Sequence, residues 1–321
     1  MEPQVASAAI SYSEATTIGG FVAIAAGLNK KGKKKDFNPS LQDYQDIVSD
    51  PDYKLLLDPD FLDKYTVKYN IQVPENDNGS DVWSYFGFIA SHNTSGDYVI
   101  AIRGTQNGFE ASRDDDFFPV PFHEYNNQGL VPQGFRIIFE TAQVISLPGA
   151  ANPKKVMLNK FAADLVKNLN LTGKQRITVT GHSLGAAVAT YFAAVATLSL
   201  KKALNLCLYT FASPKAGDKK FVSLLNDSLA ESIRIYNAED KVPNLPVWNG
   251  PQNDSYVHVT GGIGIDSTKD PNVNHEDTTK EGLGCAHQLP VYMYLLAKIG
   301  GDNNPGIISA GNDRRCRALI K

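Results

Sequence analysis

Gly181, Ser183 and Gly185 carry the clearest chemistry in this sequence, within the segment Ile-Thr-Val-Thr-Gly-His-Ser-Leu-Gly of residues 177–185. A serine with a glycine two positions away on each side is the pattern of a nucleophile elbow. The pattern alone is weak because both residue types are common, but here an apolar run precedes it and an Ala-rich helical segment follows. That context places a hydroxyl at a helix N-terminus, where an oxyanion is stabilised. We therefore expect Ser183 to be the nucleophile of a hydrolase.

A serine hydroxyl needs a general base, because the free hydroxyl is a poor nucleophile near neutral pH. In folds with such an elbow the chain order is serine, acid, histidine. Three histidines follow the elbow: His258, His275 and His287. His275 lies in a polar loop, His258 lies within a short predicted strand, and His287 directly precedes the last predicted helix. We expect His287 to be the base and keep His258 as the alternative.

The acid of the triad should leave a strand between the serine and the histidine. The apolar run 233–236 is such a strand, and the segment Asn-Ala-Glu-Asp-Lys-Val-Pro of residues 237–243 follows it. Asp240 is the expected acid, which would hold the imidazole in the correct tautomer, and Glu239 is the rival.

The elements that must position these residues alternate along the chain. Hydrophobic patterning predicts strands and helices in turn, which favours a mainly parallel sheet with helices on both faces, the α/β-hydrolase fold. The predicted strands are 82–90, 98–102, 177–179, 204–211, 233–236 and 256–259, and the predicted helices are 155–169, 184–200, 219–229 and 290–299. Catalytic residues in such sheets gather beyond the carboxyl ends of the strands.

Residues 1–321 are expected to form a single domain, with residues 1–75 as a mostly helical N-terminal extension that includes 41–48 and 53–69. The chain is 42% hydrophobic and 20% charged, which is typical of a globular protein. The apolar stretch 18–28 is too short to span a bilayer. It also lacks the preceding basic residues of a signal peptide, so we expect a cytoplasmic protein or one exported without such a signal.

The formal net charge of −3 gives no reason to expect a nucleic-acid partner. The basic cluster of residues 30–35 is expected to be solvated, with transient contact to an anionic lipid surface as the alternative. The three cysteines, Cys207, Cys285 and Cys316, lack the spacing of a zinc site, although the last two could pair. We expect neither a metal nor an organic cofactor, and the oligomeric state stays open.

Three motifs together resemble the class 3 lipases, which include fungal triacylglycerol lipases, plant phospholipases A1 and bacterial relatives. The resemblance runs from about residue 85 to about residue 296. Residues 180–187, Thr-Gly-His-Ser-Leu-Gly-Ala-Ala, look like the family's elbow, and 235–246 look like its acid loop. Residues 102–105, Ile-Arg-Gly-Thr, look like its oxyanion-hole strand.

This resemblance implies a carboxylic ester hydrolase that acts on lipid or ester substrates through an acyl-enzyme. It assigns the triad to Ser183, Asp240 and His287, and the oxyanion hole to the backbone amides of Thr105 and Leu184. Phospholipase A1 activity on membranes is the alternative, and a catalytically inactive scaffold is a more distant one.

The segment that corresponds to the family's lid, residues 106–121, departs from the usual pattern. It contains no tryptophan, and residues 113–116 are Arg-Asp-Asp-Asp. A charged lid resists opening onto oil, because moving carboxylates toward an apolar phase is costly. We therefore expect soluble short esters to be hydrolysed without a jump in rate when an emulsion forms. A cation site at the three aspartates is less expected than a solvated run.

Overall fold

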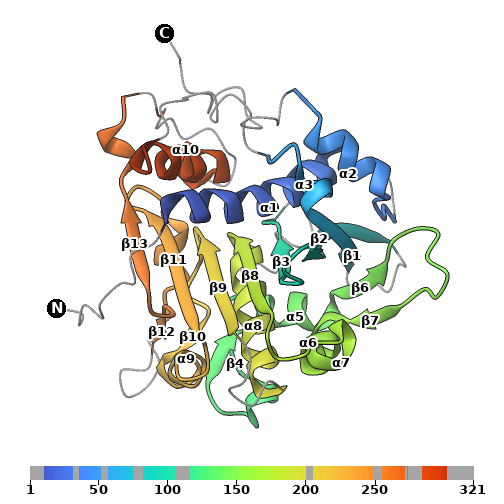
Figure 1. Ribbon diagram of the computed structural model, residues 1–321. Helices are drawn as coiled ribbons and strands as arrows, with labels where there is room; N and C mark the ends of the chain where they lie inside the picture. The colour runs from blue at the N-terminus through green and yellow to red at the C-terminus, as the bar shows by residue number, and fades with distance from the viewer. Residues whose placement is uncertain are drawn as a thin grey trace.

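The computed structural model describes residues 11–31, 36–51, 57–74, 82–105, 116–199, 205–248, 255–271, 273 and 284–301 (Figure 1). Among these residues a nine-stranded sheet runs in the order β13-β11-β9-β8-β3-β2-β1-β6-β7. Its strands are β1 (Tyr65–Pro74), β2 (Trp83–His92), β3 (Tyr98–Ile102), β6 (Gln143–Ser146), β7 (Lys155–Met157), β8 (Arg176–His182), β9 (Asn205–Phe211), β11 (Glu231–Asn237) and β13 (Gly262–Ile265). Two small pairs stand apart, β4 (Pro119–Pro121) with β5 (Leu130–Pro132) and β10 (Gly217–Asp218) with β12 (Tyr256–Val257).

The sheet has a parallel half and an antiparallel half. Within the described residues β3, β8, β9, β11 and β13 pair in parallel, whereas β2, β1, β6 and β7 continue the sheet from β3 in antiparallel pairs. The expectation of a mainly parallel sheet is therefore right for the half that carries the elbow, and the sheet as a whole is mixed. The first antiparallel pair, β2 and β3, joins two of the predicted strands in a hairpin.

Helices cover both faces of the sheet, as Figure 1 shows. One layer contains α1 and α10, with α2 and α3 beside them, and the opposite layer contains α5 to α9. The bounds are α1 (Tyr12–Lys31), α2 (Leu41–Val48), α3 (Phe61–Lys64), α5 (Gln133–Thr141), α6 (Leu158–Ala163), α7 (Leu165–Leu169), α8 (Leu184–Ser199), α9 (Lys219–Asn226) and α10 (Leu289–Ile299).

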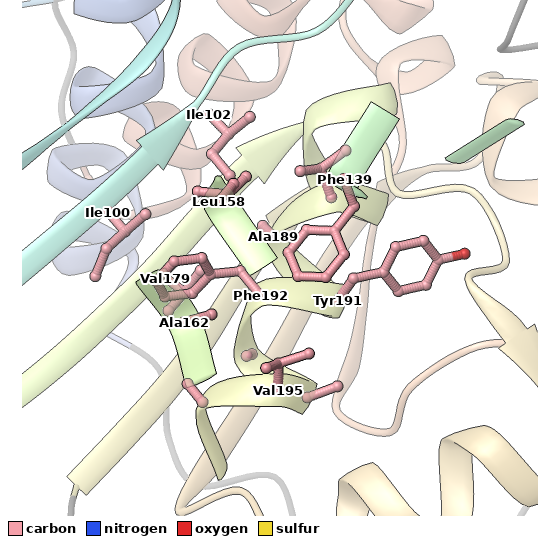
Figure 2. Close-up of a cluster of buried hydrophobic side chains, with 14 of the residues drawn as sticks. Ile100, Ile102, Phe139, Leu158, Ala162, Val179, Ala189, Tyr191, Phe192 and Val195 are labelled. Carbon is pink, nitrogen blue, oxygen red and sulfur yellow. The ribbon is translucent and has the colours of Figure 1, made fainter. Parts of the chain in front are cut away.

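Alternating residues of the central strands supply the two cores. In β3, Val99 and Ala101 belong to the core under α1 and α10, whereas Ile100 and Ile102 belong to the core under α8. Side chains of a strand point alternately to opposite faces, so a strand covered on both faces is apolar throughout. Figure 2 shows the second core, where Phe139 of α5 and Phe192 of α8 pack together with Val179 of β8. The strand and helix that flank the elbow are thus fixed by burial.

The first 75 residues differ from the expected extension. The helical interpretation of 53–69 is wrong for its last part, because β1 begins at Tyr65 and lies inside the sheet between β2 and β6. Helix α1 packs against α10 and β2 and contributes to the core on that face. This segment therefore builds the body of the fold. That the whole chain forms one domain stays a prediction.

Two other predicted elements are shorter than expected. The predicted helix 155–169 divides into strand β7 and two short helices that are separated at Asp164, whose backbone leaves the helical region at φ −105° and ψ 30°. The predicted strand 256–259 is limited to β12, which pairs with β10 outside the main sheet.

Cys207 is buried as a free thiol and Cys285 is disulfide-bonded. Cys316, which the sequence could pair with it, lies outside the described residues. No helix within the described ranges is long and apolar enough to cross a membrane.

Candidate active site

Ser183 lies in a sharp turn between β8 and α8. Its φ of +56° is in the left-handed region, which residues other than glycine rarely adopt. The backbone N–H of Ser183 donates to the carbonyl of Phe211, 3.0 Å away, and thereby ties the turn to the end of β9. The serine is 6% exposed. A residue other than glycine in this conformation stores backbone strain, and such strain is concentrated at functional sites.

The two glycines of the elbow are required because neighbouring backbone atoms leave no room for a Cβ atom at either position. A Cβ atom at Gly181 would lie 2.2 Å from the carbonyl oxygen of Gly185. A Cβ atom at Gly185 would lie 2.2 Å from the carbonyl oxygen of Arg103, at the end of the neighbouring strand β3. The two glycines therefore let α8 approach β8 and β3 closely, which is the physical reason for the pattern around Ser183.

His287 lies between the serine and the aspartate. It ends the 3₁₀ turn Cys285–His287 directly before α10. Its Nε2 is 2.9 Å from Ser183 Oγ and its Nδ1 is 2.8 Å from Asp240 Oδ2. All three side chains are nearly inaccessible, with His287 5% and Asp240 2% exposed. The structure thus brings together the three residues of the expected triad from separate segments of the chain.

The Asp240 carboxylate is held by donors on both oxygens. Oδ1 accepts from the Val242 N–H at 3.0 Å, and Oδ2 accepts from the Tyr292 hydroxyl at 2.6 Å as well as from His287. The same hydroxyl accepts from the Asn237 N–H at 3.0 Å. Burial, followed by the negative charge of Asp240, raises the pKa of Tyr292 well above its usual value, so its proton stays in place. A buried carboxylate that is satisfied in this way has one orientation.

The alternatives of the sequence lie elsewhere. His258 Nε2 is 2.7 Å from the carbonyl oxygen of Pro243, and no contact joins it to Ser183. Burial, with a smaller contribution from Arg234, lowers the pKa of His258 to about 3, so the ring is neutral and donates its proton to that carbonyl. Glu239 is exposed to solvent. His275 lies outside the described residues.

The expected oxyanion-hole residues flank the serine. Leu184 is the first residue of α8, and Thr105 follows β3. A Cβ atom at Gly104 would lie 3.2 Å from the Cβ of Ser183, so the backbone that leads to Thr105 lies directly beside Ser183. Arg103, which is fully buried, donates from Nη1 to the carbonyl of Gly104 at 2.6 Å. This arginine therefore fixes the strand end beside the elbow.

Sequence reasoning did not single out His182 and Asn237, although both lie within its motifs. His182 Nε2 is 2.8 Å from the carbonyl oxygen of His287. Asn237 Nδ2 donates to the carbonyl of Ala286 at 3.0 Å. The only signal in the sequence was their position, directly before the serine and three residues before the aspartate.

Apolar side chains are exposed on two loops that are joined through Tyr256. Val247, on the segment that continues from Asp240, is 70% exposed, and Phe118 is 67% exposed. The ring of Trp248 packs on that of Tyr256 with 4.9 Å between centroids, and the Tyr256 hydroxyl donates to the Phe117 carbonyl at 3.0 Å. These contacts connect the two loops into one partly apolar surface.

The charged part of the expected lid, residues 106–115, lies outside the described residues, as do the side chains of the basic cluster at 30–35. Asp116, the last residue of the charged run, accepts from the side chain of Gln133 at 3.0 Å. In the part of the chain that the structure covers, no three His, Cys, Asp or Glu side chains gather as a metal site would require.

Residues 99–250 match the family described as lipase (class 3). Phospholipase A1-Igamma3 of Arabidopsis thaliana is 30% identical over 144 residues, which is 38% of this chain and 27% of that protein. Phospholipase A1-II 1 of Oryza sativa subsp. indica is 26% identical over 234 residues, 68% of this chain and 56% of that protein. The chain thus spans less than two thirds of the length of these curated relatives.

Solved structures of fungal lipases share the fold. A lipase from Rhizopus microsporus var. chinensis aligns with a TM-score of 0.50 at 21% identity, covering 84% of this chain and 81% of that one. A mono- and diacylglycerol lipase from Aspergillus oryzae aligns with a TM-score of 0.51 at 19% identity, covering 86% of each chain. The α/β-hydrolase fold is therefore confirmed, and residues 99–250 carry the similarity to the class 3 lipases that the motifs predict.

Proposed function

We propose that this protein is a serine carboxylic ester hydrolase that uses Ser183, His287 and Asp240 as a catalytic triad. One observation carries the proposal: an unbroken hydrogen-bonded chain runs from Asp240 Oδ2 through His287 Nδ1 and Nε2 to Ser183 Oγ. The spacing of 2.8 and 2.9 Å fits a nucleophile, a base and the group that orients the base. The strained backbone at Ser183 supports the same assignment.

The reaction follows from this geometry. Ser183 Oγ attacks the ester carbonyl while His287 Nε2 accepts the hydroxyl proton, and the imidazolium is stabilised by Asp240. The backbone N–H groups of Thr105 and Leu184 are the proposed donors to the oxyanion of the tetrahedral intermediate. His287 then gives its proton to the departing alkoxide oxygen, which leaves an acyl-enzyme. Water attacks the carbonyl carbon of the acyl-enzyme while His287 accepts a proton from the water. His287 then returns a proton to Ser183 Oγ, and the carboxylic acid leaves.

A lipid ester is the substrate class that the surroundings favour. The exposed Val247, on the segment that continues from Asp240, and the exposed Phe118 offer apolar contacts to a lipid substrate. Related proteins are named as lipases and phospholipases A1, which act on esters of this class. We propose an acyl glycerolipid with at least one accessible ester bond.

Phospholipase A1 activity is the second candidate, because the curated relatives carry this name. It requires release of the acyl chain from the first glycerol carbon of a phospholipid. A catalytically inactive scaffold is the remaining alternative, and the intact hydrogen-bonded triad argues against it.

A substrate panel tests the proposal. Purified protein and its Ser183→Ala variant are compared on p-nitrophenyl esters of rising acyl length, on triglyceride and on a phospholipid with different acyl chains at its two positions. Release of p-nitrophenol by the wild type but not by the variant supports the esterase. Release of the first-position acyl chain alone identifies the phospholipase, and no ester cleaved by the wild type refutes the proposal.

A further inference from the structure

The segment that carries His287 has little regular structure of its own. The histidine ends a single 3₁₀ turn, Cys285–His287, and this turn is not part of any strand of the sheet. General-base catalysis needs the imidazole nitrogen within hydrogen-bonding reach of the serine. Groups outside the turn must therefore hold its backbone. Two consecutive carbonyls of the turn accept hydrogen bonds from such groups.

The first carbonyl is that of His287 itself. His182 Nε2 donates to this oxygen at 2.8 Å, and the two imidazole rings lie 4.8 Å apart at 37°. Because His182 immediately precedes Ser183, the elbow contacts the base twice, once through the serine hydroxyl and once through the neighbouring imidazole. The two contacts close a ring that fixes the distance between nucleophile and base.

The second carbonyl is that of Ala286. Asn237 Nδ2 donates to it at 3.0 Å and to the hydroxyl of Ser267 at 2.9 Å. Asn237 Oδ1 accepts from the Ser267 N–H at 3.0 Å. The amide is 1% exposed and uses both of its protons, so it has no freedom to rotate. Asn237 ends β11, the strand from which the loop of Asp240 leaves.

We infer that His182 and Asn237 are positioning residues that together hold the turn of the base. The strand end that leads to the nucleophile supplies one donor, and the strand end that leads to the acid supplies the other. Each of the two strands thereby sets the position of His287 independently of the triad's own hydrogen bonds. This inference rests on the proposed function, because it assigns both residues to the reaction of Ser183.

His182 acts through its N–H and not through a charge. Burial, and then the nearby His287, lower the pKa of His182 to about 3, so the ring is neutral wherever an esterase is assayed. A neutral donor leaves the protonation of His287 unaffected by any titration of its neighbour. A change in the charge of the site therefore plays no part in the expected effect.

The expected effect follows from how steeply catalysis depends on position. A displacement of about 1 Å at a reacting group costs about 10²-fold in rate. Loss of one of two carbonyl contacts should therefore lower kcat by about 10- to 100-fold and leave KM nearly unchanged. Because both donors hold the same turn, the two losses should not be independent.

The experiment uses the full chain and four variants. His182→Leu removes the donor, His182→Gln keeps an N–H near the same place, and Asn237→Ala removes the second donor. Tyr191→Phe is the matched control, because it removes a buried hydroxyl that donates to the Ala216 carbonyl at 2.7 Å, away from the triad. Thermal unfolding establishes that each variant is folded before kcat, KM and the pH profile are measured.

The inference predicts that His182→Leu and Asn237→Ala lower kcat about 10- to 100-fold with KM within about twofold. His182→Gln should recover most of the loss, the double variant should lose less than the product of the single losses, and Tyr191→Phe should match the wild type. The acidic limb of the pH profile should stay in place.

Three results would overturn it: folded single variants with wild-type kcat, a Gln variant no better than Leu, or an acidic limb that moves. Should His182→Leu fail to fold, Asn237→Ala decides alone. A wild-type protein that cleaves no ester and is not labelled by a fluorophosphonate refutes the proposed function instead.

Discussion

Replacement of Asp240 by asparagine changes one atom of the triad without changing its shape. If the new amide nitrogen takes the place of Oδ1, it faces the Val242 N–H, and if it takes the place of Oδ2, it faces the Tyr292 hydroxyl and His287. The first arrangement sets donor against donor, which costs about 1–3 kcal/mol for a buried group. In the second arrangement the new amide N–H donates to His287 Nδ1, so the proton of the imidazole lies on Nε2.

A histidine protonated at Nε2 cannot accept the proton of Ser183. Loss of the correct tautomer in a serine triad lowers kcat by about 10⁴-fold, or about 5 kcal/mol of transition-state stabilisation. We expect Asp240→Asn to show a loss of this order, with the protein folded and KM little changed.

The assay is hydrolysis of p-nitrophenyl butyrate under saturation, with thermal unfolding as the check on folding. Glu239→Gln is the matched control, because Glu239 is the exposed neighbour of the buried Asp240 and loses the same charge. It should keep wild-type activity. An Asp240→Asn variant within about tenfold of the wild type, or a larger loss in Glu239→Gln, would refute the assignment of the acid.

Other expectations follow from the same contacts. His287→Ala should lower kcat by several orders of magnitude and His258→Ala by much less, and a reversed order would make His258 the base. Val247→Asp should slow hydrolysis of emulsified tributyrin more than hydrolysis of a soluble ester. The control is Ile299→Asp, which should slow neither reaction; Ile299 is 50% exposed and lies at the end of α10. Equal effects of Val247→Asp on both substrates would show that Val247 does not contact lipid. Because burial lowers the pKa values of His182 and His258 to about 3, the unfolded chain, with histidine near 6.5, binds more protons below that pH. The free energy of unfolding should fall as the pH drops from about 6.5, by at most about 1.4 kcal/mol per unit for each histidine, and less steeply in His258→Gln. Unfolding curves between pH 7 and 4 measure the slopes, and equal slopes would contradict the buried neutral state of His258.

The parallel half of the sheet was predictable because its patterns are local. The helix after Ser183 is apolar around nearly its whole circumference, and the strand before it contributes the apolar Ile177 and Val179 to the core. The segments that carry Asp240 and His287 were found by their order along the chain. Their contacts with Ser183 required the fold, since they join residues that lie far apart in the sequence.

The first strand was missed although residues 65–73 alternate between apolar and polar, because the predicted helix 53–69 ran across its start. Asn70 and Gln72 of β1 are buried, and their amides are satisfied by groups distant in the sequence, such as the Tyr44 hydroxyl and the side chain of Gln143. The alternating pattern indicates a strand with one polar face, but it does not show that this face is also buried, because that burial depends on hydrogen bonds that only the folded chain provides. The roles of His182 and Asn237 escaped for the same reason, since their partners are backbone carbonyls and carry no side-chain signature.

The central claim is that Ser183 is the nucleophile, and labelling tests it most directly. The protein and its Ser183→Ala variant are treated with a fluorophosphonate, the modified residue is located by peptide mass spectrometry, and ester hydrolysis is followed in parallel. The geometry predicts one label per chain, on Ser183, that appears as activity is lost, and a folded variant with neither label nor activity. A label on another residue, or ester hydrolysis that survives in the Ser183→Ala variant, would contradict it.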